Sequence, residues 1–306
     1  MWFQVNPDPE KNSCTRPVID QPCHYGGQAV IEGVVMRGKR DLAIAVRRSD
    51  DSIIIEEEKL SSLVDRYKFL SWPVIRGTVV LVETMIMGIR ALNFSANQIA
   101  EEEGEEITPL EMTVTMLVSL LLATALFVAI PTGAVHFMRG VAESVAIQNL
   151  IEGIIRIAIF LGYVWLVAQM DDIKRVFEYH GAEHKVIYTY EAGEPLTIEN
   201  ARQQSTLHPR CGTAFLLVVM VVSIIVFSFL GEGSLLWRIS SRIVLLPVVA
   251  GIAYEIIKYV ARKQGTFWGK IVLAPGLWLQ KLTTREPDDQ QIEVAIRALQ
   301  RVLEIE

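Results

Sequence analysis

The sequence has little of three features that would indicate common classes of protein. It has only Cys14, Cys23 and Cys211 in 306 residues, too few for a disulfide framework, and a cytoplasmic location would keep them reduced. Residues 1–23 contain no apolar core, so we expect an irregular arm over residues 1–25 and no signal peptide. Basic residues are not in excess, since the net charge is −6, which argues against nucleic acid as a partner.

Charged residues are absent from two long stretches, residues 112–138 and 211–231. Each exceeds the roughly 20 residues with which a helix spans the hydrocarbon core of a bilayer. Two further apolar stretches, 147–170 and 239–261, carry a few charges that can face other helices. With 51% apolar residues, the chain is predicted to be predominantly α, a polytopic membrane helical bundle. We expect about four spans within residues 112–261, and one or two interfacial or re-entrant helices outside them.

A small β-element is predicted before the membrane domain. Residues 26–60 contain three β-like runs, at 29–36, 42–48 and 53–57, which are separated by turn residues. Three strands alone hold little core. This N-terminal β-element is therefore expected in the cytoplasm, packed on the membrane domain or on another copy of the chain.

Further helices are predicted on either side of the four spans. Residues 73–94 have a charged stripe at seven-residue intervals, and this helix either lies at the membrane surface or spans with the stripe facing other helices. The stripe consists of Arg76, Glu83 and Arg90. Within residues 262–306, the stretch 268–282 has Pro275 and Gly276 at its centre and is expected to be interfacial or re-entrant. Apolar residues then recur at helical spacing, which is typical of a docking or oligomerising helix. They are Ile292, Ile296, Leu299 and Leu303.

The distribution of cations predicts the topology. The loop between the second and third spans, residues 171–210, carries five Lys or Arg residues, whereas each short loop on the other side carries one. The segment after residue 261 is also rich in cations. By the positive-inside bias, this loop and both termini lie in the cytoplasm, and the chain is a multi-pass protein of the inner membrane whose first partner is the lipid bilayer.

The loop contains the motif His180-Gly181-Ala182-Glu183-His184. The second span is expected to continue past Met170 as one helix that carries this motif. On a helix, the two histidines share one face and Glu183 lies three residues after the first of them. The pattern H-x-x-E-H is the inverted zinc peptidase signature, in which two histidines hold the metal and the carboxylate is the base. Buried, hydrogen-bonded histidines that only pack the core are the alternative.

A second pair of metal-binding residue types follows one loop later. His208 and Cys211 lie three residues apart, and imidazole and thiolate both suit zinc. We expect a divalent metal, zinc by these residue types, with His208 or Cys211 as the third ligand. Three glutamates are weaker candidates for that role, namely Glu191, Glu199 and Glu255.

Two hypotheses of different classes follow. In the first, the chain is a metal-dependent hydrolase with its site at the cytoplasmic face, where Glu183 activates water against a peptide, a lipid or a membrane protein. In the second, it is a non-enzymatic scaffold or a transporter-like protein with a structural metal or none, and its intramembrane charges pair locally. Those pairs would be Glu152 with Arg156 and Glu255 with Lys258. Three protein ligands favour the enzyme, and four favour the scaffold.

Three blocks of sequence resemble one family. They are GGQAVIEGVVMRG at residues 26–38, YHGAEHKVIYTY at 179–190 and HPRCGTAF at 208–215. Together they are similar to the YqhQ-like bacterial membrane proteins, a family described as metal-dependent on the strength of its motifs. The resemblance implies a membrane location and a metal, without establishing an activity. The residues that fall in its blocks are Gln28, Glu32, Arg37, His180, Glu183, His184, His208 and Cys211.

Overall fold

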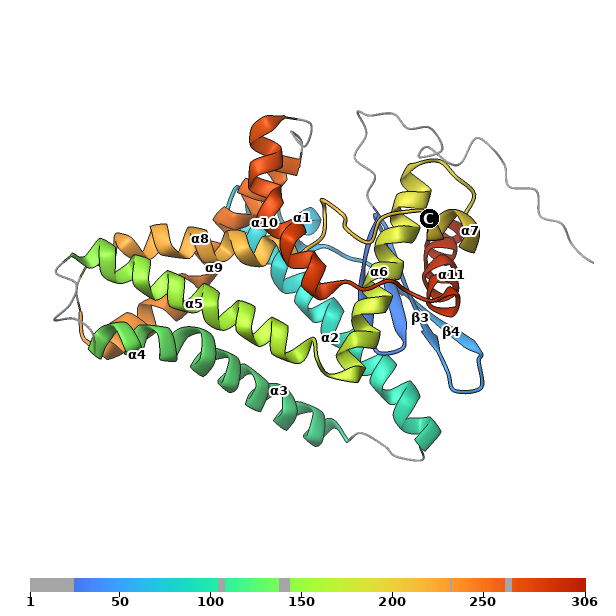
Figure 1. Cartoon of the computed structure of the whole chain (residues 1–306), viewed down its shortest axis with the longest axis horizontal. Helices are drawn as coiled ribbons and strands as arrows, with labels where there is room; N and C mark the ends of the chain where they lie inside the picture. The colour runs from blue at the N-terminus through green and yellow to red at the C-terminus, as the bar shows by residue number, and fades with distance from the viewer. Residues whose placement is uncertain (1–24, 104–107, 138–143, 232, 262–265) are drawn as a thin grey trace, which may run out of the picture.

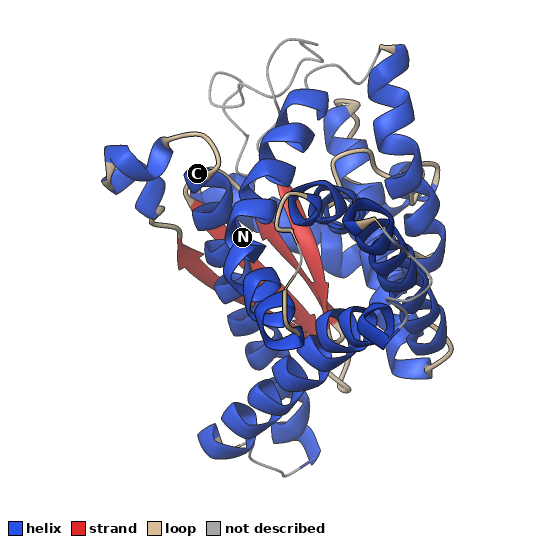
Figure 2. Cartoon of the chain, turned by 90° about the vertical axis from the view of Figure 1, so that its left-hand side faces the viewer, coloured by secondary structure: helices blue, strands red, loops and turns tan. Residues whose placement is uncertain are grey.

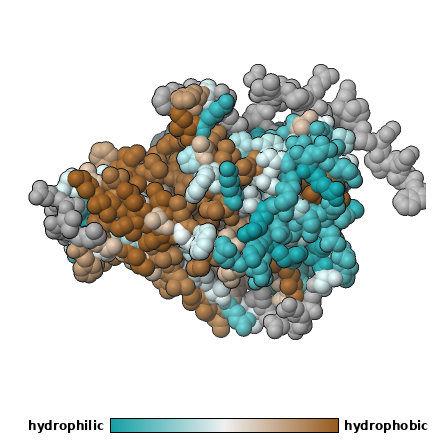
Figure 3. Space-filling view, viewed as in Figure 1, coloured by the Kyte–Doolittle hydropathy of each residue, from teal (hydrophilic) through white to brown (hydrophobic). Residues whose placement is uncertain are grey.

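A computed structural model describes residues 25–103, 108–137, 144–231, 233–261 and 266–306 (Figure 1). It confirms a predominantly α-helical chain with a small antiparallel sheet at its N-terminal end. Apolar side chains cover one end of the molecule, and hydrophilic ones gather at the other end around the sheet and its helices (Figure 3). The predicted arm lies outside the described residues except for Tyr25.

The sheet has four strands where three runs were predicted. The antiparallel order is β1-β2-β3-β4, with β1 Gly26–Val30, β2 Gly33–Arg37, β3 Asp41–Arg47 and β4 Ile53–Lys59. The expectation of one run at 29–36 was wrong, because the chain reverses at Ile31 and Glu32. Glu32 has φ 50°, in the left-handed region, and Gly33 follows it. Such a two-residue reversal is hard to recognise in a sequence without an Asn-Gly or Asp-Gly pair.

Helices cover both faces of this sheet (Figures 1 and 2). On one face lie α6, Asp171–Glu191, and α11, Asp289–Ile305, whose apolar stripe of Ile292, Ile296 and Leu299 is buried against β2 and β3. The last helix is therefore a docking element within the chain. The other face is covered by α2, Ile75–Glu103, through Met87, Ala91 and Phe94.

The apolar end is built from long helices. Among the described residues, four helices are long and apolar enough to cross a membrane, namely Ile75–Glu101 in α2, Leu110–Phe137, α5 (Val145–Val167) and Leu235–Val260 in α9. The number four matches the prediction, but its members differ, since the expected third span is the shorter α8, Thr213–Ser228. The second candidate comprises α3 (Pro109–Thr124), the π-turn η2 (Ala125–Ala129) and α4 (Ile130–Phe137). The full bounds of α9 are Leu235–Ala261.

Packing divides α2 between the two ends of the molecule. Near its start, Arg76 forms a bidentate ion pair with Glu255 of α9 at 2.6 and 2.5 Å, and Thr78 donates to the Pro247 carbonyl at 2.7 Å. From Glu83 onward its side chains bind the sheet and its connections instead, as in the bond from Arg37 to Thr84. Eight residues before Glu83 cover only about 12 Å, too short to cross a bilayer. Over its whole length α2 is nonetheless long and apolar enough to cross a membrane, so the choice between a surface helix and a span stays a prediction.

The expected continuation of the second span into the motif helix was wrong. α5 ends at Val167, and α6 begins at Asp171 after a turn. Asp171 and Asp172 occupy the first turn of α6, where carboxylates suit the positive end of a helix dipole. The Ala168 carbonyl accepts a bond at 3.0 Å from Arg285, which follows the last helix of the apolar end. That helix is α10, Phe267–Thr283, which runs through Pro275 without a break. The short segments are α1 (Leu63–Arg66), η1 (Lys68–Ser71) and α7 (Ile198–Arg202).

A buried ion network joins α5 to α9. The Glu152 carboxylate accepts from Arg156 at 2.8 Å and from two nitrogens of Arg242 at 2.9 Å each, and Thr132 donates to it at 3.1 Å. The local pair Glu152–Arg156 is thus present as the scaffold hypothesis expected. Arg242 adds a partner distant in sequence. The hydrogen-bonded partner of Glu255, by contrast, is Arg76 of α2.

Candidate metal centre

Three of the predicted site residues converge where the polar and apolar ends meet. His180 and His184 come from successive turns of α6, and Cys211 lies just before the first turn of α8. One ligand atom from each lies within 4.8 Å of the other two. The His180 Nε2 atom is 3.2 Å from the Cys211 sulfur, and the two imidazole centroids are 4.4 Å apart. We call these three residues the His-His-Cys cluster.

Backbone carbonyls orient both imidazoles. His180 Nδ1 lies 2.8 Å from the Thr283 carbonyl oxygen, and His184 Nδ1 lies 2.5 Å from that of Thr206. A carbonyl oxygen can only accept, so each Nδ1 must carry the proton and donate it. Each Nε2 then has a lone pair facing the cluster. Histidines that bind metals are held in this way by their second nitrogen.

His184 shows the strongest sign that a group is meant to bind here. Its Nε2 is buried and, among the described residues, has no hydrogen-bond partner. A buried polar atom without a partner is costly and calls for an explanation such as an ion. Burial also lowers the pKa of the His184 imidazole, against the opposing effect of Cys211. The neutral form that results is the one that binds metals.

Glu183 lies between the cluster and the sheet. Its carboxylate Oε2 is 3.8 Å from His184 Nε2, and its side chain lies against Gly27 of β1. Burial raises the pKa of Glu183, and the imidazoles of His180 and His208 oppose that shift. A Cβ at position 27 would lie 2.8 Å from Glu183 Cγ and 2.4 Å from the Val35 carbonyl. Glycine therefore allows β1 to approach the site.

Gly181 has a similar role on the other side of α6. A Cβ there would lie 2.0 Å from the Arg285 carbonyl oxygen. The chain after α10 crosses α6 at this point, with Arg285 N donating to the Phe177 carbonyl at 2.9 Å. The same segment supplies the Thr283 carbonyl to His180. The helix-weakening glycine inside the motif is thus explained by a close backbone approach.

His208 lies beside the cluster but is not part of it. Its backbone exchanges two hydrogen bonds with the Gln280 side chain, at 2.7 and 2.8 Å. Its Nδ1 accepts from the Arg210 N–H at 3.3 Å, so its Nε2 carries the proton and faces Glu191 at 3.5 Å. Burial lowers the pKa of His208. The structure therefore brings His180, His184 and Cys211 together. Both ring nitrogens of His208, the fourth predicted ligand, face other groups instead.

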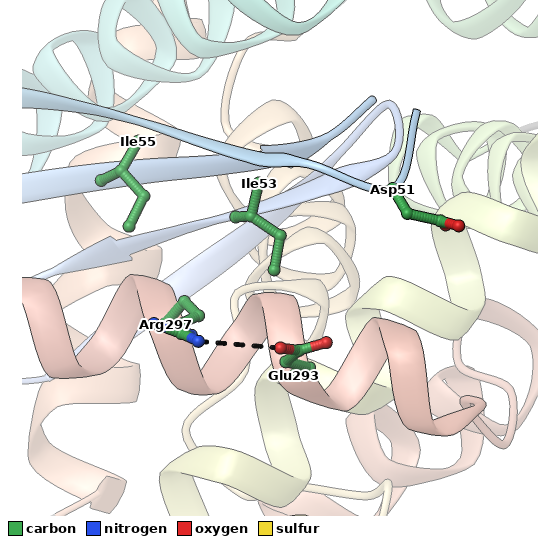
Figure 4. Close-up of a pocket in the computed structure, with 5 residues that line it drawn as sticks. All are labelled: Asp51, Ile53, Ile55, Glu293 and Arg297. Atoms are coloured by element: carbon green, nitrogen blue, oxygen red, sulfur yellow. Dashed lines mark ion pairs between the residues drawn. The ribbon is translucent and has the colours of Figure 1, made fainter. Parts of the chain in front are cut away.

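The weaker candidates lie apart from the cluster. Glu255 pairs with Arg76, and Glu191 pairs with Arg210 and faces His208. Glu199 is exposed on α7. The pocket between β4 and α11, lined by Asp51, Ile53, Ile55, Glu293 and Arg297, belongs to the opposite edge of the sheet from β1 (Figure 4). Its Glu293–Arg297 ion pair, at 3.9 Å, is a helix-surface contact.

Sequence reasoning missed the residues that support the cluster. Lys185 is buried, and its ammonium donates to the carbonyls of Arg202 and Gln204 at 2.8 Å each and pairs with Glu286 at 2.7 Å. It fixes the loop that presents the Thr206 carbonyl to His184. Thr206 and Thr283 act through their backbone, so their side-chain types give no signal. Lys185, directly after His184 on the motif helix, was the one residue in the sequence that could have indicated this support.

Fold and site together define a helical membrane protein with a small sheet domain and a candidate metal centre between them. The chain belongs to the family described as "Protein of unknown function (DUF1385)", whose model matches residues 72–305. It is 35% identical over 303 residues to the "Uncharacterized protein YqhQ" of Bacillus subtilis (strain 168). The matched region covers 93% of this chain and 94% of that protein. The resemblance to YqhQ-like proteins is thereby confirmed. No solved structure matches the chain.

Proposed function

We propose that this chain is a metal-dependent hydrolase of the membrane, with its site on the cytoplasmic side. His180, His184 and Cys211 would hold the ion, and Glu183 would be the general base. The observation that carries the proposal is the pair of Nε2 lone pairs, fixed by backbone carbonyls, that converge with the Cys211 sulfur. Two imidazoles and a thiolate are a donor set that suits zinc.

The number of ligands supports an enzyme over a scaffold. Catalytic zinc sites have three protein ligands and an open fourth position, whereas structural sites have four. His208, the remaining predicted ligand, uses Nδ1 to accept from Arg210 and Nε2 to face Glu191. We therefore assign His208 to bracing the loop before Cys211, so that three residues, His180, His184 and Cys211, would hold the ion.

The residues divide the chemistry between them. A divalent ion bound here would polarise the scissile carbonyl and increase the acidity of a nearby water molecule. Glu183 accepts the proton of the attacking water and later delivers it to the leaving group, because its carboxylate lies 3.8 Å from His184 Nε2 without belonging to the cluster.

The test compares Glu183→Gln with Glu199→Gln in full-length protein purified in lipid nanodiscs and loaded with zinc. Substrates are a mixed-sequence library of quenched fluorescent peptides and a panel of phospholipids and N-acyl amides. We expect Glu183→Gln to keep its zinc and to lose about 10²–10⁴-fold in hydrolysis. Glu199→Gln, which removes an exposed carboxylate on α7, should keep its activity. If neither substrate set is hydrolysed by the wild type while zinc binds stoichiometrically, the hydrolase assignment fails and a structural metal site remains.

A further inference from the structure

The edge of the sheet nearest the candidate metal centre is β1. β1 is an outer strand, paired with β2 alone, and its Gly27 lies against Glu183, since a Cβ at position 27 would be 2.8 Å from Glu183 Cγ. Gly27 is exposed, and Gly26, Gln28 and Ala29 are partly exposed. This edge of the sheet therefore lies next to the proposed general base and is accessible to another molecule.

The register determines which backbone groups point outward from β1. Arg47 N donates to the Glu32 carbonyl at 2.8 Å, and Gly38 N donates to that of Asp41 at 2.9 Å. Because bonded pairs alternate in an antiparallel ladder, the even-numbered residues of β2 bond β3 and its odd-numbered residues bond β1. Gly26, Gln28 and Val30 are thus bonded to β2, while the groups of Gly27 and Ala29 point away from the sheet.

The Gly27 backbone lies against Glu183, because a Cβ at position 27 would be 2.8 Å from Glu183 Cγ. The Ala29 N–H and C=O have no hydrogen-bond partner among the described residues. Ala29 thus offers a donor and an acceptor in the arrangement with which one strand binds another. It lies two residues, or about 7 Å, along β1 from Gly27.

We propose, on the basis of the hydrolase function above, that the substrate is a polypeptide that adds to β1 as an extended strand. A substrate residue opposite Ala29 exchanges two backbone hydrogen bonds with it. Pairing cannot continue to Gly27, because the Glu183 side chain lies against it. The substrate backbone is therefore released from the sheet beside Glu183, where its next peptide bonds meet the His-His-Cys cluster.

The reaction at that position is peptide hydrolysis. Water adds to the carbonyl carbon and gives one proton to Glu183, and the C–N bond then breaks with transfer of that proton to the departing nitrogen. The products are a carboxylate and an amine. A polypeptide matches this edge because its own N–H and C=O groups repeat at strand spacing. An acyl chain has no such groups.

The experiment removes the Ala29 donor without disturbing the sheet. Proline is tolerated on an edge strand where the N–H points away from the ladder, so Ala29→Pro should fold. The matched control is Lys59→Pro on β4, the opposite edge of the sheet. Arg48 N donates to Ser52 O and Leu60 N donates to Arg40 O, so the even-numbered residues of β4 bond β3. The Lys59 N–H therefore also points away from the sheet. Both variants are compared with the wild type in nanodiscs, using the quenched peptide library, zinc stoichiometry and thermal stability.

We expect Ala29→Pro to keep its zinc and lose about tenfold in kcat/KM, and Lys59→Pro to cleave as the wild type does. As a measurement that does not depend on how Ala29→Pro folds, the best-cleaved peptide is N-methylated at one residue at a time. A single amide two or three residues from the scissile bond should then prove essential.

Three results would overturn the inference while sparing the hydrolase. In the first, hydrolysis depends on Glu183 but occurs with lipids or N-acyl amides and with no peptide. In the second, Ala29→Pro is folded, binds zinc and cleaves peptides as the wild type does. In the third, N-methylation of the peptide does not affect its cleavage. An Ala29→Pro variant that only converts a dimer to a monomer would assign the edge to a second copy of the chain. Absence of all hydrolysis would instead refute the proposed function itself.

Discussion

Replacing Glu152 with glutamine is predicted to destabilise the membrane domain strongly. Glu152 is 1% exposed and accepts bonds from two arginines, Arg156 and Arg242, which are themselves buried. Glutamine keeps the size of the side chain but leaves two buried cations without their shared carboxylate. Removing one member of a buried ion pair costs about 3–5 kcal/mol. For a chain of this size, that loss corresponds to a decrease in Tm of roughly 5–10 °C.

The matched control is Glu255→Gln, which also removes a carboxylate bound twice by an arginine. The side chains of Arg76 and Glu255 are 29% and 25% exposed, and only one arginine loses its carboxylate. We expect a smaller loss of stability there than in Glu152→Gln. A third variant combines Glu152→Gln with Arg156→Met and Arg242→Met, and it should recover part of the stability because no buried charge remains unpaired.

The assay is thermal unfolding of the purified full-length variants in one detergent, followed by intrinsic tryptophan fluorescence. The expected order of Tm is wild type, Glu255→Gln, the triple variant and then Glu152→Gln. A Glu152→Gln protein that melts with the wild type would show that the network contributes little, and the reasoning from buried charge would be refuted.

Three further predictions concern the site and its orientation. Gly181→Ala should lose zinc and about 1–3 kcal/mol of stability, because its Cβ would lie 2.0 Å from the Arg285 carbonyl oxygen. The control Gly162→Ala, whose Cβ would meet nothing within 4 Å, should keep both its zinc and its thermal stability. Lys185→Met should weaken zinc binding about 10–100-fold in a competition titration, since the loop that presents Thr206 loses its anchor; unchanged affinity would exclude this role. A cysteine introduced at Gln203 should resist impermeant thiol reagents in intact cells, and ready labelling would invert the topology.

Much of the fold follows from composition and periodicity. Long charge-free stretches predicted helices at the apolar end, and the spacing of Ile292, Ile296 and Leu299 predicted an amphipathic last helix, which the structure docks on the sheet. The errors occur where a short local feature overrides periodicity. Asp171 and Asp172 begin a new helix, and a left-handed Glu32 makes two strands of one run.

The site was predictable only in the part that side-chain types encode. The spacing of His180 and His184 gave the shared helix face, and Cys211 was a natural ligand type. Sequence could not choose between His208 and Cys211, because that choice depends on the Gln280 side chain and the Arg210 N–H, which hold His208 in place. Nor could it reveal Ala29 or Thr283, whose contributions come from backbone groups.

Zinc stoichiometry of four single variants tests the central claim most directly. His180→Ala, His184→Ala, Cys211→Ala and His208→Ala would be purified in full length with the wild type, equilibrated with one equivalent of zinc, desalted and measured by elemental analysis. The account predicts one zinc per chain in the wild type and in His208→Ala, and a loss of most of it in the other three. Equal zinc in His184→Ala and the wild type, or a loss confined to His208→Ala, would contradict the His-His-Cys cluster as the metal centre.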